Sequence, residues 1–144
     1  MKTELDKILS VSGKTGLFRV LTGGKNTIIA ESLVDGKRHP ILSSQRVSAL
    51  ADLSMFTIEE DVPLRDVLSN MRESYQSGPA PDHRSESNML RDEMRKILPE
   101  YDEERVYDSD IRKLFNWYNI LQAKGMLDFA EPPAEEKGAE GEVD

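Results

Sequence analysis

The sequence has 144 residues, of which 38% are hydrophobic and 32% charged, and it contains no cysteine. This length suits one compact domain or two very small ones, and it is too short for a large enzyme fold. Without cysteine the chain has no disulfide, no thiolate nucleophile and no cysteine-based zinc site. Two such small parts would gain stability by packing on each other or on a second copy of the chain.

The net charge of −8 is unevenly distributed along the chain. Residues 1–56 hold 8 basic and 5 acidic residues, residues 57–129 hold 10 and 16, and residues 130–144 hold 1 and 6. Only the first segment has a charge that tolerates a polyanion. No apolar run approaches the roughly 20 residues of a membrane helix, and the first residues lack a signal-peptide pattern. We therefore expect a cytoplasmic protein without membrane contact.

The first half of the chain is predicted to begin with one or two helical turns and to continue as strands. Residues 3–9 place three apolar residues on one helical face behind a possible Thr3 cap. Short β-prone runs then follow at residues 17–21, 27–34, 37–42 and 46–56. Asp35-Gly36 predicts a hairpin, because a type I′ turn needs positive φ at both central residues. Four or five short strands favour a small antiparallel barrel, since closure removes exposed edges.

After Phe56 the apolar period changes from two to 3.6, which predicts helices. Thr57 to Glu60 matches a capping box, and Pro63 is acceptable in a first helical turn. Three apolar stripes follow: Leu64, Val67, Leu68, Met71 and Tyr75; Leu90, Met94, Ile97, Leu98 and Tyr101; and Ile111, Leu114, Phe115, Tyr118 and Leu121.

The second and third stripes are predicted to form a helical hairpin. Asp108 or Ser109 is the expected cap of the last helix, and Gly125 its C-terminal stop. Residues 76–84 hold two prolines and a glycine and are expected to be a linker. The predicted organisation is a small β-barrel domain over residues 1–60, a helical region over 61–129, and a disordered acidic tail over 130–144.

Two motifs resemble functional sites but favour ordinary structure. Ser12-Gly13-Lys14-Thr15 resembles the end of a phosphate-binding loop, yet Ile8 stands where that motif needs a further glycine. His39 and His83 have no carboxylate at a helical metal-ligand spacing, so we expect solvated histidines. No cofactor and no metal ion are expected.

A basic patch and a broad helix face are the candidate binding sites. Lys25, Lys37 and Arg38 lie at two predicted hairpin turns, and Arg46 follows in the next connection. If these turns share one end of a barrel, they form a patch that could contact nucleic-acid phosphates. Stacking aromatics are lacking there, because Phe18 and Phe56 both fit the core.

In the last predicted helix, Trp117 and Ile120 flank the main apolar stripe and widen it. We therefore consider both as interface residues, with an intramolecular core role as the competing interpretation. Arg112 and Lys113 lead the same helix, but the long connection before it does not fit a DNA-reading helix-turn-helix motif.

Three stretches carry a family resemblance: residues 4–14 (ELDKILSVSGK), 31–38 (ESLVDGKR) and 46–50 (RVSAL). They resemble a family of Bacteroidetes proteins with an N-terminal domain of unknown function and a helical C-terminal domain of unknown function, over about residues 2–127. The resemblance implies an SH3-like small barrel in front of the helices, in agreement with the strand count. It implies no catalytic residue.

The expected fold class is therefore α+β, and the expected function is a non-enzymatic protein-interaction module that binds a protein partner or a second copy. The alternative is a nucleic-acid-associated protein that uses the basic patch. An enzyme would need a carboxylate pair such as Glu31 and Asp35 in a cleft.

Overall fold

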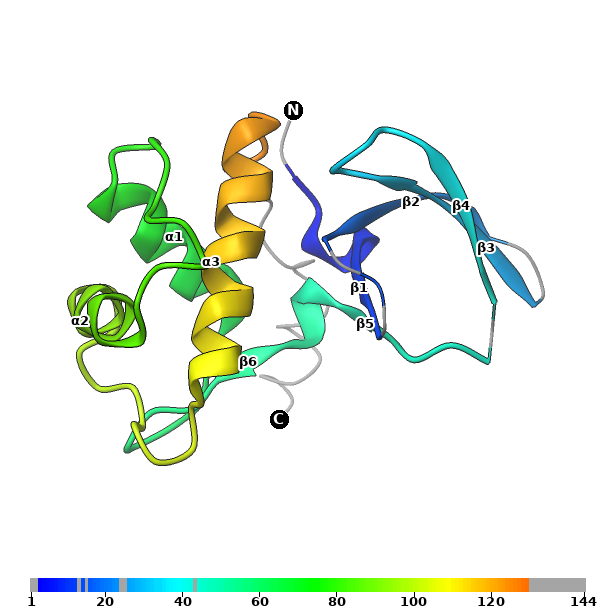
Figure 1. Cartoon of the computed structure of the whole chain (residues 1–144). Helices are drawn as coiled ribbons and strands as arrows, with labels where there is room; N and C mark the ends of the chain where they lie inside the picture. Colours follow the sequence, from blue (N-terminus) through cyan, green and yellow to red (C-terminus); the bar gives the residue numbers. More distant parts are fainter. Residues whose placement is uncertain (1–2, 13, 15, 24–25, 43, 130–144) are drawn as a thin grey trace, which may run out of the picture.

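The computed structural model describes residues 3–12, 14, 16–23, 26–42 and 44–129. An antiparallel sheet is followed by three helices, so the α+β class is confirmed. In Figure 1, α3 lies between the sheet and the other two helices. The elements are η1 (Leu5–Lys7), β1 (Ile8–Val11), β2 (Phe18–Gly23), β3 (Thr27–Ser32), β4 (Arg38–Leu42), β5 (Val47–Ala49), η2 (Leu50–Asp52), β6 (Ser54–Met55), β7 (Val62–Pro63), α1 (Leu64–Ser74), α2 (Ser87–Ile97) and α3 (Asp108–Ala123). No helix in the described ranges has both the length and the apolar character of a membrane span.

The five-stranded sheet has the order β4-β3-β2-β1-β5, with β4 and β5 at its two edges. No ladder joins these edges in the described part of the chain, so the sheet is not closed and the expected SH3-like barrel is not shown. One physical reason is length, because β5 has three residues before η2 begins and pairs with β1 alone.

The hairpin predicted at Asp35-Gly36 is confirmed as the β3–β4 connection, but its turn type is not I′. The turn covers five residues, and Gly36 has a positive φ of 74° whereas Asp35 does not. The Gly36 N–H donates to the Ser32 carbonyl at 2.9 Å, and the Ser32 N–H donates to the Lys37 carbonyl at 2.8 Å. A single left-handed glycine is therefore sufficient to reverse the chain here.

The prediction of helical turns over residues 3–9 is mostly wrong. Only η1 is helical, and Ile8 and Leu9 belong to β1, which pairs with both β2 and β5. Pairing on both sides of β1 outweighs the local helical pattern. Successive residues of β1 face opposite sides, so Ile8 packs in the main core while Leu9 and Val11 pack within the sheet.

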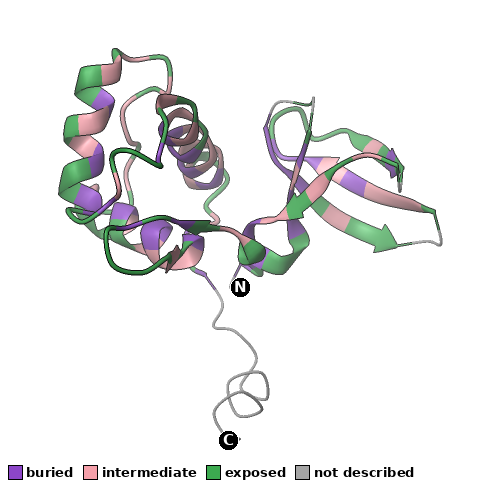
Figure 2. Ribbon diagram, turned by 90° about the horizontal axis from the view of Figure 1, so that it is seen from below, coloured by how far each residue is buried: buried purple, intermediate pink, exposed green. Residues whose placement is uncertain are grey.

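Two apolar clusters hold the fold together. The main core joins buried residues of the helical half to six that precede α1: Leu5, Ile8, Leu17, Leu33, Leu50 and Met55. The sheet cluster contains Leu9, Val11, Phe18, Ala30 and Ile41, with half-buried Val20, Ile28, Val47 and Ala49 around them. Figure 2 shows mostly exposed and half-buried residues on the strands farthest from the helices. The sheet is thus thinly covered at its outer end.

The first and third apolar stripes are confirmed, but the predicted N-terminal caps are wrong. The second stripe is confirmed only in part, because α2 ends at Ile97, before Leu98 and Tyr101. Four residues of the first stripe are buried in α1, and all five of the third stripe are buried in α3. Helix α1 begins at Leu64 after Pro63, and the Thr57 hydroxyl instead accepts the N–H groups of Glu59 and Glu60 within its own turn. Helix α3 is capped through the Asp110 carboxylate, which accepts the Tyr107 N–H at 3.0 Å.

Helices α2 and α3 do not form the expected hairpin. Figure 1 shows α2 almost end-on and α3 from the side, so the two helices cross. The connection between them pairs with the segment after β6: Thr57 and Tyr101 form an isolated antiparallel bridge, and the Asp102 N–H donates to the Phe56 carbonyl at 2.9 Å. This pairing directs the chain away from an antiparallel return. Gly125, with φ of +68°, follows the end of α3 as predicted.

The expected linker, residues 76–84, is bound along α3 and is called the strap below. The Tyr118 hydroxyl donates to the Gly78 carbonyl at 2.8 Å, and the Asn119 side chain accepts the Ala80 N–H at 2.8 Å. Gln76 and Ser77 reach positive φ to start it. The strap is therefore an ordered part of the helical layer.

The two ends of the described chain meet beside η1. The Thr3 N–H donates to the Asp128 carbonyl at 2.6 Å, and Thr3 forms an isolated parallel bridge with Phe129. The acidic tail predicted for residues 130–144 lies outside the described residues.

Candidate functional site

A groove of about 260 Å³ lies between the sheet and α3. Its sides come from β1 and β5, from the segment around β6, and from the first half of α3. The groove is therefore built jointly by the N-terminal and C-terminal halves of the chain.

Helix α3 supplies one side of the groove with four regularly spaced residues. Asp110, Lys113, Leu114 and Trp117 follow at i, i+3, i+4 and i+7, the spacing of residues on a single helix face. Leu114 is buried, Trp117 is half-buried and Lys113 is exposed. This side thus passes from an apolar interior to a charged rim.

Two serines form the sheet side of the groove. Ser10 of β1 and Ser48 of β5 are directly paired across the ladder, and both line the groove. Their neighbours Leu9, Val11 and Val47 point to the other face of the sheet, into the sheet cluster. Small hydroxyl side chains on this face leave space in front of α3 that a larger apolar pair would fill.

An exposed aromatic ring stands at the rim of the groove. Phe56 is 40% exposed, which corrects its expected core position, while Phe18 is buried as expected. The Arg105 guanidinium lies 4.5 Å from the centre of the Phe56 ring. That guanidinium also donates to the Asp102 carboxylate at 2.8 Å and to the Thr57 carbonyl at 3.1 Å. The ring is held in place although much of it is open to solvent.

The two predicted interface residues have different surroundings. Trp117 packs partly against the main core and lines the groove, and its indole N–H has no hydrogen-bond partner among the described residues. Ile120 also packs on the main core but lies toward the sheet, where a Cβ at Gly16 would be 3.9 Å from its Cδ1. The structure therefore places Trp117 at the groove and Ile120 at the junction between α3 and the sheet.

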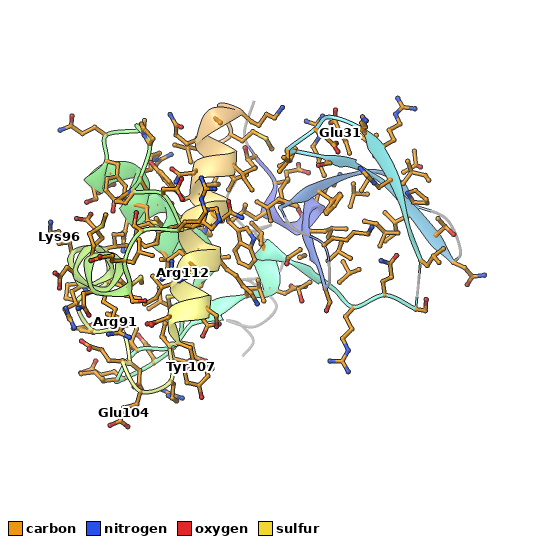
Figure 3. All side chains as sticks on the ribbon, viewed as in Figure 1. Glu31, Arg91, Lys96, Glu104, Tyr107 and Arg112 are labelled. Atoms are coloured by element: carbon orange, nitrogen blue, oxygen red, sulfur yellow. The ribbon has the colours of Figure 1, made fainter. Side chains whose placement is uncertain are left out.

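A second, more polar hollow of about 510 Å³ adjoins the groove at Val106. Arg91 binds the Asp108 carboxylate at 2.8 and 2.9 Å, and Arg95 binds the Glu103 carboxylate at 3.0 and 3.1 Å. These bonds lower the pKa of both carboxyl groups. Figure 3 shows Arg91 at the same end of the helical layer as exposed Tyr107.

The hydroxyl of Tyr101, which also lines this hollow, is buried and has no hydrogen-bond partner in the described ranges. Burial raises the pKa of Tyr101. Because both arginines are already bound to carboxylates, the hollow offers little free positive charge to a ligand.

The predicted basic residues do not lie at one end of the sheet. Arg38 is paired with Glu31 at one end of the β3–β4 ladder, whereas Thr27 and Leu42 pair at the other end, from which the chain leads to Arg46. Five residues of strand separate these ends by roughly 15 Å. Lys37 adjoins Arg38 and is exposed, and Lys25 lies outside the described residues. The ladder therefore separates Lys37 and Arg38 from Arg46.

The other sequence candidates have structural partners. Glu31 forms an ion pair with Arg19 at 2.6 Å, while Asp35 accepts the Lys37 N–H at 2.8 Å, a bond that lowers the pKa of Asp35. Neither carboxylate lines the groove or the polar hollow. His39 is half-buried instead of solvated and meets the Phe18 ring edge-on at 5.5 Å. The phosphate-loop residues Gly13 and Thr15 lie outside the described residues.

Arg112 has a structural role instead of a DNA-reading one. Its guanidinium donates to the carbonyls of His83 and Ser85 at 2.7 and 2.9 Å and to the Ser87 hydroxyl at 3.0 Å. Figure 3 shows its position on α3. These bonds hold the end of the strap and the start of α2 against α3.

Sequence reasoning missed most of the groove. Ser10 and Ser48 were detectable as single polar residues within apolar strands, but their pairing depends on long-range register. Lys113 was noted only as a possible DNA contact, and Phe56 was assigned to the core. A groove with an aromatic side, a hydroxyl side and a charged rim is suited to holding one or two side chains of another molecule.

Comparison with known proteins gives a family without a named activity. Residues 5–50 match a family model described as a domain of unknown function (DUF5606), and residues 53–121 match a second one (DUF6852). No curated protein matches the chain. A solution NMR structure from Bacteroides vulgatus, a target of the Northeast Structural Genomics Consortium, is similar with 38% sequence identity and a TM-score of 0.72. The match covers 90% of this chain and 94% of that one. The chain therefore belongs to the family of this Bacteroides vulgatus protein, in agreement with the resemblance found in its sequence.

Proposed function

We propose that the protein is a non-enzymatic interaction module of the cytoplasm, and that a protein partner binds in the groove between the sheet and α3. The observation that carries this proposal is the position of the Trp117 side chain, which is half-buried on one side of the groove and whose indole N–H has no hydrogen-bond partner among the described residues. Partly buried tryptophans that line a pocket are the residues that most often dominate binding energy at protein interfaces.

The size and chemistry of the groove favour a protein side chain over a metabolite. Small-molecule sites usually have volumes of about 300–1,000 Å³, and this groove has about 260 Å³. Its centre is apolar and its rim carries Asp110, Lys113 and the exposed ring of Phe56. An apolar centre with a polar rim is the usual anatomy of a protein interface.

The SH3-like barrel implied by the family resemblance remains part of this proposal. Its support is the pairing of β1 with both β2 and β5, which brings the last strand of the sheet next to the first. The edge strands β4 and β5 stay unjoined in the described structure.

Selection of binding peptides tests the proposed function. The full-length chain would be used to select from a displayed library of random dodecapeptides, and affinity would be followed through the fluorescence of Trp117, the single tryptophan of the chain. We expect bound peptides to shift this fluorescence and Lys113→Glu to alter their affinity. Trp117→Ala should weaken binding at least tenfold, measured by calorimetry.

The matched control is Tyr107→Ala, which removes an aromatic side chain that is 65% exposed and lies outside the groove. Its binding should equal that of the original chain. Failure to enrich any peptide, together with a monomer in light scattering, would rule out the proposed function. Salt-sensitive RNA binding that is lost in Arg38→Glu or Arg46→Glu would favour the nucleic-acid alternative instead.

A further inference from the structure

The two edges of the sheet differ in how they present their backbone groups. Just before β4, the Lys37 carbonyl accepts the N–H of Ser32 at the end of β3. Hydrogen-bonded and non-hydrogen-bonded pairs alternate along an antiparallel ladder, so Arg38, Pro40 and Leu42 direct their backbone groups away from β3. Pro40 has no N–H, and the Leu42 N–H already donates to the Gln45 side chain at 2.8 Å. Proline and occupied donors protect an edge from pairing with another strand.

The opposite edge, β5, has no such protection. The Ser12 N–H donates to the Arg46 carbonyl at 2.8 Å, so in the alternating ladder Ser10 and Ser48 form the next hydrogen-bonded pair. The N–H and C=O groups of Val47 and Ala49 consequently point away from β1. The N–H and C=O of Val47 and the N–H of Ala49 have no hydrogen-bond partner within the described ranges, whereas the Ala49 carbonyl is at the N-cap of η2 and accepts the first bond of that helical turn. Edge β5 therefore offers two donors and one acceptor to an incoming strand.

The apolar cluster of the sheet is incomplete beside this same edge. Val47 and Ala49 border the sheet cluster but are only half-buried, and the same holds for Val20 and Ile28. Since no ladder in the described structure occupies the outer side of β5, an added strand could cover the side chains of Val47 and Ala49. Backbone pairing and apolar burial would both be gained at one place.

The register fixes which side of an added strand each side chain would occupy. Residues opposite Val47 and Ala49 would face the sheet cluster, because side chains of neighbouring strands share a face. A residue opposite Ser48 would face the groove that contains Trp117. A bound segment thus needs apolar residues at two alternate positions, with the residue between them directed into the groove.

Charges at the two ends of β5 differ in sign. Arg46 precedes the strand, and exposed Lys14 lies in the adjacent β1–β2 connection, where its N–H donates to the Val11 carbonyl. Asp52 is exposed in η2, just beyond the other end. None of these three side chains forms an ion pair with a described residue. An incoming strand with a carboxylate near Arg46 and a cation near Asp52 matches this arrangement.

We propose that the free edge of β5 is the docking site for an extended segment of a partner protein, which adds to the sheet as a further antiparallel or parallel strand. The segment carries apolar side chains at alternate positions and opposite charges at its two ends. This inference rests on the proposed function for the nature of the partner and adds the conformation in which that partner binds.

Substitution of Ala49 by proline removes one outward donor without disturbing the pairing of β5 with β1. Ala49 has φ of −79° and ψ of 141°, which proline can adopt, and its N–H is not needed by β1. The control Ala49→Ser keeps the N–H and nearly the same size. Peptides selected on the full-length chain should bind Ala49→Pro at least tenfold more weakly and Ala49→Ser within about twofold.

Hydrogen exchange measured by NMR supplies an independent test, since the Val47 and Ala49 amides should become protected when a selected peptide binds. Unchanged affinity of Ala49→Pro, or amides that stay unprotected, would overturn strand addition, and loss of binding in Trp117→Ala would then leave the proposed function standing. Without any enriched peptide both proposals fail. A dimer of the free chain that Ala49→Pro dissociates would assign the edge to a second copy and also overturn the proposal.

Discussion

The helical half and the outer sheet are stabilised very differently. In the described structure the main core contains 23 buried apolar residues, whereas the sheet cluster contains five and is surrounded by half-buried side chains. Hydrophobic burial is the dominant favourable contribution to folding, so most of the stability resides in the helices and in the strand residues that pack on them. The outer strands depend more on their ladder, and regions of this kind open locally at a lower free-energy cost.

The largest expected effect comes from a cavity in the main core. Phe115 is fully buried, and Phe115→Ala should lower the free energy of unfolding by about 3–5 kcal/mol, as such truncations usually do. Ile41→Ala in the sheet cluster should cost about 2 kcal/mol, the low end for such truncations, because its half-buried neighbours can move into the space. Guanidinium denaturation measures both values. Equal losses would mean that the two regions do not differ as proposed.

Two glycines test how tightly the junction between the sheet and the helices is packed. Gly16 and Gly36 both have left-handed φ values, +85° and +74°, but only a Cβ at Gly16 would meet another atom, Val34 Cγ2 at 2.7 Å. The backbone alone should cost roughly 1–2 kcal/mol in either alanine variant. Gly16→Ala should cost about 1–2 kcal/mol more than Gly36→Ala, by overpacking.

Thermal denaturation of the two alanine variants tests this difference. A second substitution, Val34→Ala, should recover most of the extra loss at Gly16 and none of the loss at Gly36. A result in which Gly16→Ala and Gly36→Ala are equally stable would show that the junction is loosely packed.

A smaller effect is expected from the strap. Tyr118→Phe removes the hydroxyl that donates to the Gly78 carbonyl and keeps the buried ring. The loss should be about 1 kcal/mol, the usual net value of one hydrogen bond. Amide exchange should accelerate in residues 76–84 and stay unchanged in the outer sheet. Equal acceleration in the sheet would contradict the independence of the two regions.

The smallest effect concerns acid stability of the helical half. Hydrogen bonds from Arg91 hold the pKa of Asp108 below its ordinary value of 3.8, and those from Arg95 hold the pKa of Glu103 below 4.5. A lowered pKa gives stability that is present above the ordinary value and is lost as the pH falls through the folded-state value.

The melting temperature should therefore fall below about pH 4, and Asp108→Asn should make that fall shallower. Glu103 is exposed and Asp108 is partly exposed, so both ion pairs are screened by salt. In about 0.5 M salt the difference in melting temperature between the two proteins should therefore become smaller. A variant with the same pH profile as the original chain would show that this ion pair does not contribute.

The sequence predicted the elements whose pattern is local. The stripes of α1 and α3 follow the helical period, and the hairpin at Asp35-Gly36 is marked by its turn residues. Each of these elements was placed within a few residues. The failures share one cause, namely contacts far apart in the chain. Ile8 and Leu9 fit a helical face, but β1 receives partners from residues 18–19 and 47–49.

The site was less predictable than the fold. Trp117 could be singled out because it lies beside the core stripe of its helix, where extra apolar surface is unexpected. The serine side of the groove could not be predicted, because that needs the register in which Ser10 pairs with Ser48. The free edge of β5 could not be predicted either, because that needs the order of hydrogen-bonded and non-hydrogen-bonded pairs in the same ladder. Neither follows from residue spacing alone.

The meeting of Thr3 with residues 126–129 has a consequence for how the chain can be rearranged. Because the Thr3 hydroxyl donates to the Met126 carbonyl at 3.0 Å and its backbone is bonded to Asp128, the first and last described residues are held side by side. A short connection between them would close the chain with little strain, so new ends could be opened in an exposed turn such as the one at Gly36. A circularly permuted chain of this kind should fold, with its new termini in a turn that is exposed to solvent.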